Sequence, residues 1–354
     1  MTSSKSFFEE AEKIYRLLED DESKVIFKNR LLYLATGERR YIHKMIECRY
    51  SEHYRQFENV CRQAKEIVLY GAGDYCYSAI EALKEYTNRE PSCICDGSKD
   101  KWGTTGPGGY QVISPDQLFA EHMDATVIIS TIRCMGEIRN RLLEHFDGES
   151  IFELGLGLSE KTIEDQYFDE DIVNFEANGE YFVDGGAYDL MTSVILSKKT
   201  LVKKVYAFEA DAMNEKKIRD TMRDNSDLPV ELFMKGLWDH EDVLYFDSGD
   251  EMESKIASDD SKGNSSIEAV ALDDVIDGKV TFIKMDIEGA ELNALIGAKE
   301  TIRKYRPKLA ICLYHKPEDM IDIPAYIHEL VPEYRFYVRH YADFQYDTVL
   351  YAML

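Results

Sequence analysis

The sequence predicts an α/β protein in which a helical N-terminal segment precedes two parallel-sheet domains. A chain of 354 residues is longer than one hydrophobic core usually fills, so two domains are expected. Short apolar strands alternate with helical stretches from residue 67, and the alternation stops near residue 150 and restarts near residue 179. Such alternation is typical of parallel sheets with crossover helices. The predicted divisions are residues 1–66, 67–150, a linker at 151–178, and 179–354.

Composition and charge narrow the classes of function. Hydrophobic residues make up 44% of the chain, which is enough for packed cores. The formal net charge of −25 repels nucleic acid and anionic membrane surfaces, so we expect neither as a partner. The apolar runs are too short to cross a bilayer, and residues 1–5 lack the apolar core of a signal peptide. We therefore expect a cytoplasmic protein.

Neither the cysteines nor the N-terminal helices predict chemistry. The seven cysteines include one close pair, Cys93 and Cys95, without a second pair at zinc-site spacing, so reduced thiols are expected. Apolar residues recur at helical spacing over about residues 5–66, with Gly37 as a helix end. These faces fit a hydrophobic core or a homodimer interface.

Residues 67–150 have the strand and glycine pattern of a Rossmann-like domain. A strand at residues 67–70 runs into Gly71-Ala72-Gly73, but Cys76 stands where a dinucleotide fingerprint has its third glycine. Together with Asp96 and residues 102–103 and 109–115, this turn resembles small nucleotide- or sugar-nucleotide-binding domains. The alternative is a degenerate domain that serves packing or dimerisation.

In the second half, three consecutive strands end in residues suited to a nucleoside. Residues 181–183 lead to Asp184-Gly185-Gly186, where small residues let a ligand approach the backbone and the next helix offers free N–H groups. The alternative there is a structural tight turn. Residues 204–208 end at Glu209, which can accept hydrogen bonds from a ribose diol or stay a solvated charge. The third strand, 231–234, leads to Asp239 at the expected place of an adenine.

A fourth strand, residues 280–285, continues into a charged segment. Period-two geometry puts Lys284, Asp286 and Glu288 on one side of the strand and apolar residues on the other. Such a pattern at the carboxyl end of a strand indicates a site. The alternative is a purely structural pair of Lys284 with an acid, since buried charges demand partners.

These segments together resemble the FkbM family of methyltransferases. The resemblance rests on residues 184–188, 207–209, 270–274, 282–291 and 348–352, in the expected order. It departs from the family after Glu209, where members often have a proline and this chain has Ala210-Asp211-Ala212. The resemblance covers residues 179–354 and leaves the first half of the chain unassigned.

The resemblance implies a class I fold, with a seven-stranded mixed sheet and helices on both faces, and S-adenosylmethionine as methyl donor. It also implies a hydroxyl of a small molecule or a sugar as acceptor, and the resemblance of residues 67–150 would suit a nucleotide sugar. Glu209 would hold the ribose hydroxyls, and Asp239 would lie beside the adenine. The expected cofactor-binding residues are Asp184, Gly185, Gly186, Ala187, Tyr188, Glu209, Ala210, Asp239 and Asp286.

A hydroxyl acceptor needs its proton removed, and His315 is the preferred base. It follows a strand at residues 309–314 that should end beside Asp286, although a structural histidine is the alternative. Lys284, Asp286 and Glu288 complete the predicted catalytic set. A divalent cation held by Asp286, Glu288 and Glu291 is a further alternative, but a salt-bridged cluster is simpler, so no metal is predicted. An anionic acceptor, such as a phosphate or a carboxylate, is expected to bind Lys316 and a tip late in the chain. The residues of this tip are Arg339, His340 and Tyr341.

Two functions from other classes remain open from the sequence. One is a protein that binds S-adenosylmethionine or a sugar nucleotide for regulation or scaffolding. The other is a nicotinamide-dependent sugar oxidoreductase that uses Gly71-Ala72-Gly73, against which the missing third glycine weighs.

Overall fold

The computed structural model describes residues 4–131, 134–155, 166–247, 255–256, 265–342 and 344–354. The chain divides into two compact units. The seven-stranded unit comprises Met1–Phe27, Glu164–Arg339 and Tyr346–Leu354, and the five-stranded unit comprises Lys28–Ile163 and His340–Gln345. Part of the predicted linker, residues 156–165, lies outside the described residues.

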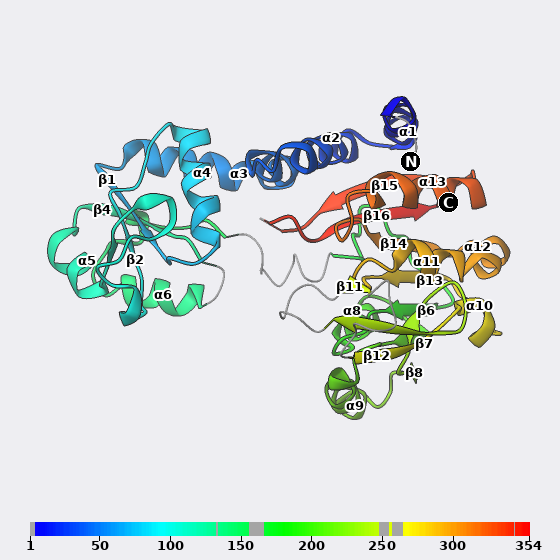
Figure 1. The fold of residues 1–354 in the computed structure, drawn as a ribbon. Helices are drawn as coiled ribbons and strands as arrows, with labels where there is room; N and C mark the ends of the chain where they lie inside the picture. The colour runs from blue at the N-terminus through cyan, green and yellow to red at the C-terminus, as the bar shows by residue number, and fades with distance from the viewer. Residues whose placement is uncertain (1–3, 132–133, 156–165, 248–254, 257–264, 343) are drawn as a thin grey trace. The chain divides into compact units, whose positions relative to one another are not determined.

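The five-stranded unit has a parallel sheet of order β3-β2-β1-β4-β5. Its central strands β1 and β4 are almost entirely apolar and buried, as expected for parallel strands covered by helices on both faces. Figure 1 shows α4, α5 and α6 around this sheet. The strands are β1 (Glu66–Tyr70), β2 (Cys93–Cys95), β3 (Val112–Ile113), β4 (Ala125–Ile129) and β5 (Ile151–Glu153). The α-helices in the first 150 residues of the chain are α1 (Ser4–Leu17), α2 (Asp21–Thr36), α3 (Arg40–Gln63), α4 (Tyr75–Thr87), α5 (Pro115–Glu121) and α6 (Met135–Leu142).

The glycine turn after β1 is occupied by protein contacts. Gly71 has φ +119°, and a Cβ there would lie 3.0 Å from the backbone oxygen of Ser130, so only glycine fits. Asp96, after β2, accepts hydrogen bonds from the backbone N–H of Ala72 at 2.7 Å and of Ser98 at 2.8 Å. The Lys101 ammonium also lies 3.2 Å from Asp96, so this acid bonds to its own turn and is paired with a lysine.

The seven-stranded unit confirms the predicted mixed sheet. Its order is β15-β16-β14-β13-β6-β7-β8, parallel from β14 to β8, with β16 antiparallel to β14. Its strands are β6 (Glu180–Gly185), β7 (Val202–Phe208), β8 (Val230–Phe233), β13 (Phe282–Met285), β14 (Lys308–Cys312), β15 (Arg335–His340) and β16 (Thr348–Met353). Its helices beyond α1 are α8 (Met191–Lys199), α9 (Glu215–Asp224), α10 (Leu272–Val275), α11 (Glu291–Ile296), α12 (Lys299–Tyr305) and α13 (Asp319–Leu330).

A small second sheet accompanies the large one. Its order is β11-β10-β12-β9, and it follows β8 in the chain. The strands are β9 (Gly236–Leu237), β10 (Asp242–Asp247), β11 (Lys255–Ile256) and β12 (Ser265–Val270). This insertion brings Leu244, Ser266 and Ile267 to the cavity described below.

The structure assigns several predicted segments differently. The late tip predicted at Arg339 and His340 is the end of strand β15, because the segment joins the sheet beside β16. The expected linker contains β5, which pairs with β4. Helix α1, expected to belong with α2 and α3, lies in the seven-stranded unit, where Leu18 bridges to Phe336. Across the described part of the chain, no helix is both long and apolar enough to span a membrane.

Candidate active site

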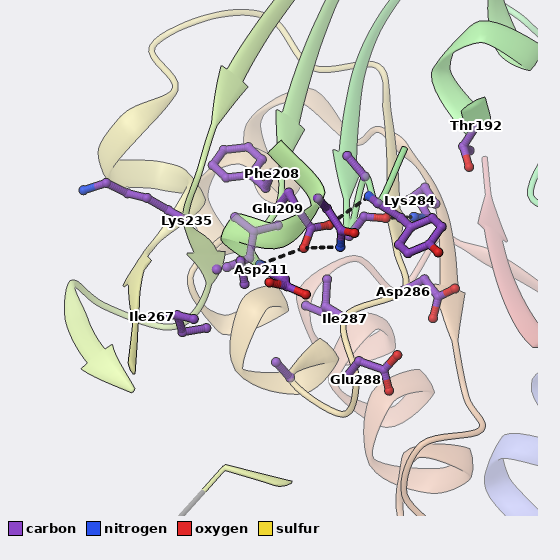
Figure 2. Close-up of a pocket in the computed structure, with 18 of the residues that line it drawn as sticks. Thr192, Phe208, Glu209, Asp211, Lys235, Ile267, Lys284, Asp286, Ile287 and Glu288 are labelled. Atoms are coloured by element: carbon purple, nitrogen blue, oxygen red, sulfur yellow. Dashed lines mark hydrogen bonds between the residues drawn. The ribbon is translucent and has the colours of Figure 1, made fainter. Parts of the chain in front are cut away.

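A cavity of about 1000 Å³ opens at the carboxyl ends of β6, β7 and β13 (Figure 2). In open α/β sheets, ligands bind at this edge. Six of the nine predicted cofactor-binding residues line the cavity: Gly186, Ala187, Tyr188, Glu209, Ala210 and Asp286. Asp184 and Gly185 lie behind that wall, within β6.

The turn after β6 packs directly on the turn after β13. Gly186 has φ +76°, and a Cβ there would lie 1.9 Å from the backbone oxygen of Asp286. The buried Lys284 ammonium ties the two turns together, donating to the backbone oxygens of Gly185 at 3.0 Å and Gly186 at 2.7 Å. It also lies 3.2 Å from the Asp184 carboxylate. Although burial favours neutral lysine, Asp184 and Asp286 raise the pKa of Lys284, so it stays charged.

Lys284 therefore shapes the cavity wall. The sequence left open whether Lys284 pairs with an acid, and in the structure it pairs with Asp184. Asp184 is buried as well, and its second oxygen accepts the Ser193 hydroxyl at 2.6 Å. A buried charge pair with these additional hydrogen bonds holds the glycine turn in one conformation.

Glu209 is fixed at the end of β7 by backbone groups. Its carboxylate accepts the N–H of Tyr188 at 2.8 Å and the N–H of Asp211 at 2.8 Å. Figure 2 shows Glu209 and Asp211 together on the cavity wall. The Asn214 amide is a third and longer donor at 3.4 Å, and because a carboxylate has about four lone-pair directions, these contacts leave acceptor capacity for a ribose hydroxyl.

Asp286 lines the cavity on the opposite side from Glu209 in the sheet order and is held by two phenols. Tyr167 donates to it at 2.8 Å and Tyr314 at 2.7 Å. Burial opposes ionisation, but Lys284, His315 and the two tyrosines hold the pKa of Asp286 below its usual value. Asp286 is thus an oriented carboxylate at neutral pH.

His315 lies behind this wall, among three carboxylates. Its Nε2 is 3.4 Å from Asp286 and 3.6 Å from Glu288, and its Nδ1 is 2.9 Å from Glu291. Burial favours the neutral ring, but Glu291, Asp286 and Glu288 outweigh it and raise the pKa of His315 to about 9. Asp286 and Glu288 face the cavity in Figure 2, whereas the described lining does not include His315.

Asp286, Glu291 and His315 also offer ligand atoms within 4.8 Å of one another, the spacing of a metal site. Here the protonated His315 already supplies a positive charge between the carboxylates. The ion-paired cluster therefore accounts for the geometry.

Backbone strain gathers around the cavity. Eight described non-glycine residues have positive φ, and four of them line the cavity: Tyr167, Tyr188, Glu288 and Asp347. Such conformations cost about 1–3 kcal/mol each and persist where surrounding structure holds them, often at functional sites.

The predicted acceptor-binding residues have protein partners instead of positions on the described cavity lining. The Lys316 ammonium donates to the backbone oxygen of Gly289. Arg339 is buried, with its guanidinium 2.7 Å from Asp20. His340 and Tyr341 are buried, and Tyr341 lies under the Arg49 guanidinium in the five-stranded unit. Burial and nearby Arg30 lower the pKa of His340 to about 3.

Asp239, the predicted adenine-side residue, pairs with His240 at 2.6 Å, and the described lining does not include it. Lys235, Gly236 and Leu237 line that side of the cavity instead.

Three lining residues had no signal in the sequence. Gln166 and Tyr167 lie in the segment expected to be a linker, and Asp347 immediately precedes β16. The Gln166 amide donates to Asp347 at 3.0 Å and to the Tyr167 hydroxyl at 3.1 Å, and Tyr167 in turn donates to Asp286. We call Gln166, Tyr167 and Asp347 the acceptor wall. Its contacts join residues 119 and 181 positions apart, which no local pattern predicts.

The strand order, the glycine turn after β6 and the acid after β7 are together those of a class I methyltransferase. Comparison with known proteins gives the family. Residues 179–345 match the model of the methyltransferase FkbM domain. The seven-stranded unit thus carries an FkbM-family domain, that of an S-adenosylmethionine-dependent methyltransferase.

Among the solved structures similar to this chain, an FkbM methyltransferase shares the fold. Methyltransferase FkbM from Methylobacillus flagellatus KT aligns over 84% of this chain and 93% of its own, with 20% identity and a TM-score of 0.51. An rRNA methylase from Streptococcus thermophilus aligns over 55% of this chain and 92% of its own, with 15% identity and a TM-score of 0.34. A SAM dependent methyltransferase from Aquifex aeolicus aligns over 54% and 92%, with 17% identity and a TM-score of 0.31. No curated protein sequence matches the chain.

Proposed function

We propose that this protein transfers the methyl group of S-adenosylmethionine to a hydroxyl of a small molecule or a sugar in the cytoplasm. The observation that carries the proposal is a single cavity lined by Glu209 on one side and by Asp286 on the other. Glu209 suits a ribose diol, and Asp286 is an oriented carboxylate suited to an acceptor hydroxyl.

The bound cofactor supplies an activated methyl group, so the protein's task is chiefly to position the acceptor and to take its proton. Asp286 accepts a hydrogen bond from the acceptor hydroxyl. The proton passes to His315 when that ring is in its neutral form, and its Nε2 lies 3.4 Å from Asp286. Lys284 acts as a positioning residue through the turn that it holds.

The pKa of His315 sets the direction of the pH dependence. A base works in its deprotonated form, and the carboxylates around His315 raise its pKa to about 9. The fraction of active base therefore rises with pH up to that value. Turnover should increase from neutral to alkaline pH.

Calorimetry with S-adenosylmethionine, S-adenosylhomocysteine, NAD and a UDP-sugar tests the proposal. We expect binding of the first two compounds to the seven-stranded unit. Glu209→Ala should weaken this binding about 10- to 100-fold, because the ribose loses a charge-assisted hydrogen bond worth about 1.5–3 kcal/mol. Glu215→Ala, which removes an exposed carboxylate at the start of α9, is the matched control.

Unchanged affinity in a folded Glu209→Ala variant would remove Glu209 from the cofactor site. Binding of NAD in place of S-adenosylmethionine would favour an oxidoreductase. Methyl transfer itself is measured as S-adenosylhomocysteine released in the presence of hydroxylated acceptors, and cofactor binding with no transfer to any of them would favour a regulatory binding protein.

A further inference from the structure

The cavity has an excess of negative charge. Among the described residues, six carboxylates line it: Asp189, Glu209, Asp211, Asp286, Glu288 and Asp347. Two lysines, Lys235 and Lys284, line it as well. Both lysines are already engaged, Lys284 with Asp184 at 3.2 Å and Lys235 with Glu268 at 2.9 Å. The buried Lys284 ammonium is therefore unavailable to an anionic acceptor, whereas Lys235 makes only a solvent-exposed ion pair, and the carboxylates still outnumber the lysines.

The cavity also has room for a second ligand. Its volume of about 1000 Å³ is at the upper end of the roughly 300–1,000 Å³ typical of small-molecule sites. Glu209 and the glycine turn account for the nucleoside side. The acceptor wall, with Asp347, is linked by hydrogen bonds to Asp286, the side to which the proposed function assigns the acceptor hydroxyl.

Asp347 is held in place by the hydrogen bond from Gln166 and is half-buried. Burial and the neighbouring Asp286 raise its pKa to about 6, against the opposing effects of Gln166 and His315. His315, a cation whose charge acts on Asp347, is shared among Asp286, Glu288 and Glu291. A half-buried carboxylate in this position gains most from a cationic ligand.

We propose that the acceptor carries a protonated amino group, which Asp347 on the acceptor wall binds while a hydroxyl of the same molecule lies against Asp286. The acceptor class is thus an amino-bearing polyol, such as an amino sugar. This inference rests on the proposed function and replaces the anionic acceptor expected from Lys316 and Arg339. A carboxylate wall would repel phosphate and carboxylate groups.

The test uses the full-length protein saturated with S-adenosylhomocysteine, so that only the acceptor side is free. The probes are glucosamine, N-acetylglucosamine and glucose 6-phosphate, whose binding is followed by ligand-observed NMR at millimolar concentration. N-acetylation removes the positive charge and keeps most hydroxyls. We expect glucosamine to bind about tenfold more tightly than its acetylated form, the usual scale for a partly buried charge pair.

Variants assign that preference to the wall. Asp347→Asn should lower the affinity for glucosamine about tenfold and leave N-acetylglucosamine nearly unchanged. Asp227→Asn makes the same chemical change at an exposed position outside the described lining and should alter neither. Gln166→Leu, which removes the hydrogen bond that holds Asp347, provides a second variant of the wall if Asp347→Asn does not fold, and it should also weaken the preference for glucosamine.

Equal or tighter binding of the acetylated or phosphorylated probe would overturn the inference, as would no binding of glucosamine. Retention of the preference in Asp347→Asn would also overturn it. A protein that fails to bind S-adenosylhomocysteine would instead contradict the proposed function, so the two failures are distinguishable.

Discussion

Asp286 is the residue on which the proposed methyl transfer depends. It combines a position on the cavity lining with three kinds of support: two phenols, the buried Lys284 and the nearby His315. Each of these keeps the carboxylate ionised and fixed in direction. Fixed groups that need no rearrangement during a reaction are the main means by which enzymes position and stabilise reacting groups.

His315→Ala should lower turnover about 10²- to 10⁴-fold with cofactor affinity unchanged, because a positioned base is lost. Wild-type turnover should rise with pH toward about 9, the raised pKa of His315, and the variant should lose this rise. The assay is S-adenosylhomocysteine release across pH, with and without a chelator.

His122→Ala is the control, since that histidine pairs with the single carboxylate of Glu66 at 3.0 Å in the five-stranded unit. It should leave turnover unchanged. Turnover that persists in His315→Ala would contradict the role of His315 as the base. So would wild-type turnover that does not vary between neutral pH and pH about 9. Activity lost to the chelator would show that a metal is required, and Asp286, Glu291 and His315 would be its candidate ligands.

At the scale of elements, the cavity depends on the contact between the turns after β6 and β13. Gly186 lies so close to the backbone of Asp286 that no side chain fits between them. The Lys284 ammonium donates hydrogen bonds to two backbone oxygens of the same turn. The identity of one glycine and one lysine thereby fixes the distance between two neighbouring strand ends.

Gly186→Ala should destabilise the seven-stranded unit by about 2–5 kcal/mol, from left-handed strain of about 1–2 kcal/mol plus overpacking of about 1–3 kcal/mol. Gly37→Ala is the control because Gly37 also has positive φ but a Cβ there meets nothing within 4 Å. It should cost about 1–2 kcal/mol. Urea unfolding measures both, and equal costs would show that the turns separate without penalty.

At the scale of the whole molecule, the chain has two units, and each has its own sheet and core. Units with separate cores often unfold in separate transitions. The cofactor cavity is lined by residues of the seven-stranded unit alone.

S-adenosylhomocysteine at 100 times its Kd should therefore stabilise one of two unfolding transitions by about 2.7 kcal/mol and leave the other in place. Calorimetric or fluorescence-detected unfolding measures this. A single transition that moves as a whole would show instead that the two units unfold cooperatively.

Local pattern was sufficient for the strands that carry the cofactor side. Glu209 and Gly186 were predicted because the end of a short apolar strand followed by an acid or a glycine is visible within a few residues. The parallel alternation then predicted that these ends share one edge of the sheet, and the seven-stranded order confirms that sheet.

The part of the cavity proposed for the acceptor was decided by tertiary structure alone. Tyr167 meets Asp286 across 119 residues, and Gln166 meets Asp347 across 181, so neither pairing has a local signature. Arg339 looked like an exposed anion-binding residue, yet β15 buries it beside Asp20, 319 positions away in sequence. The sequence by itself determined which strand ends carry chemistry, because that depends on neighbouring residues. Which charges remain free to meet a substrate depends on long-range partners, and only the folded chain brings those together.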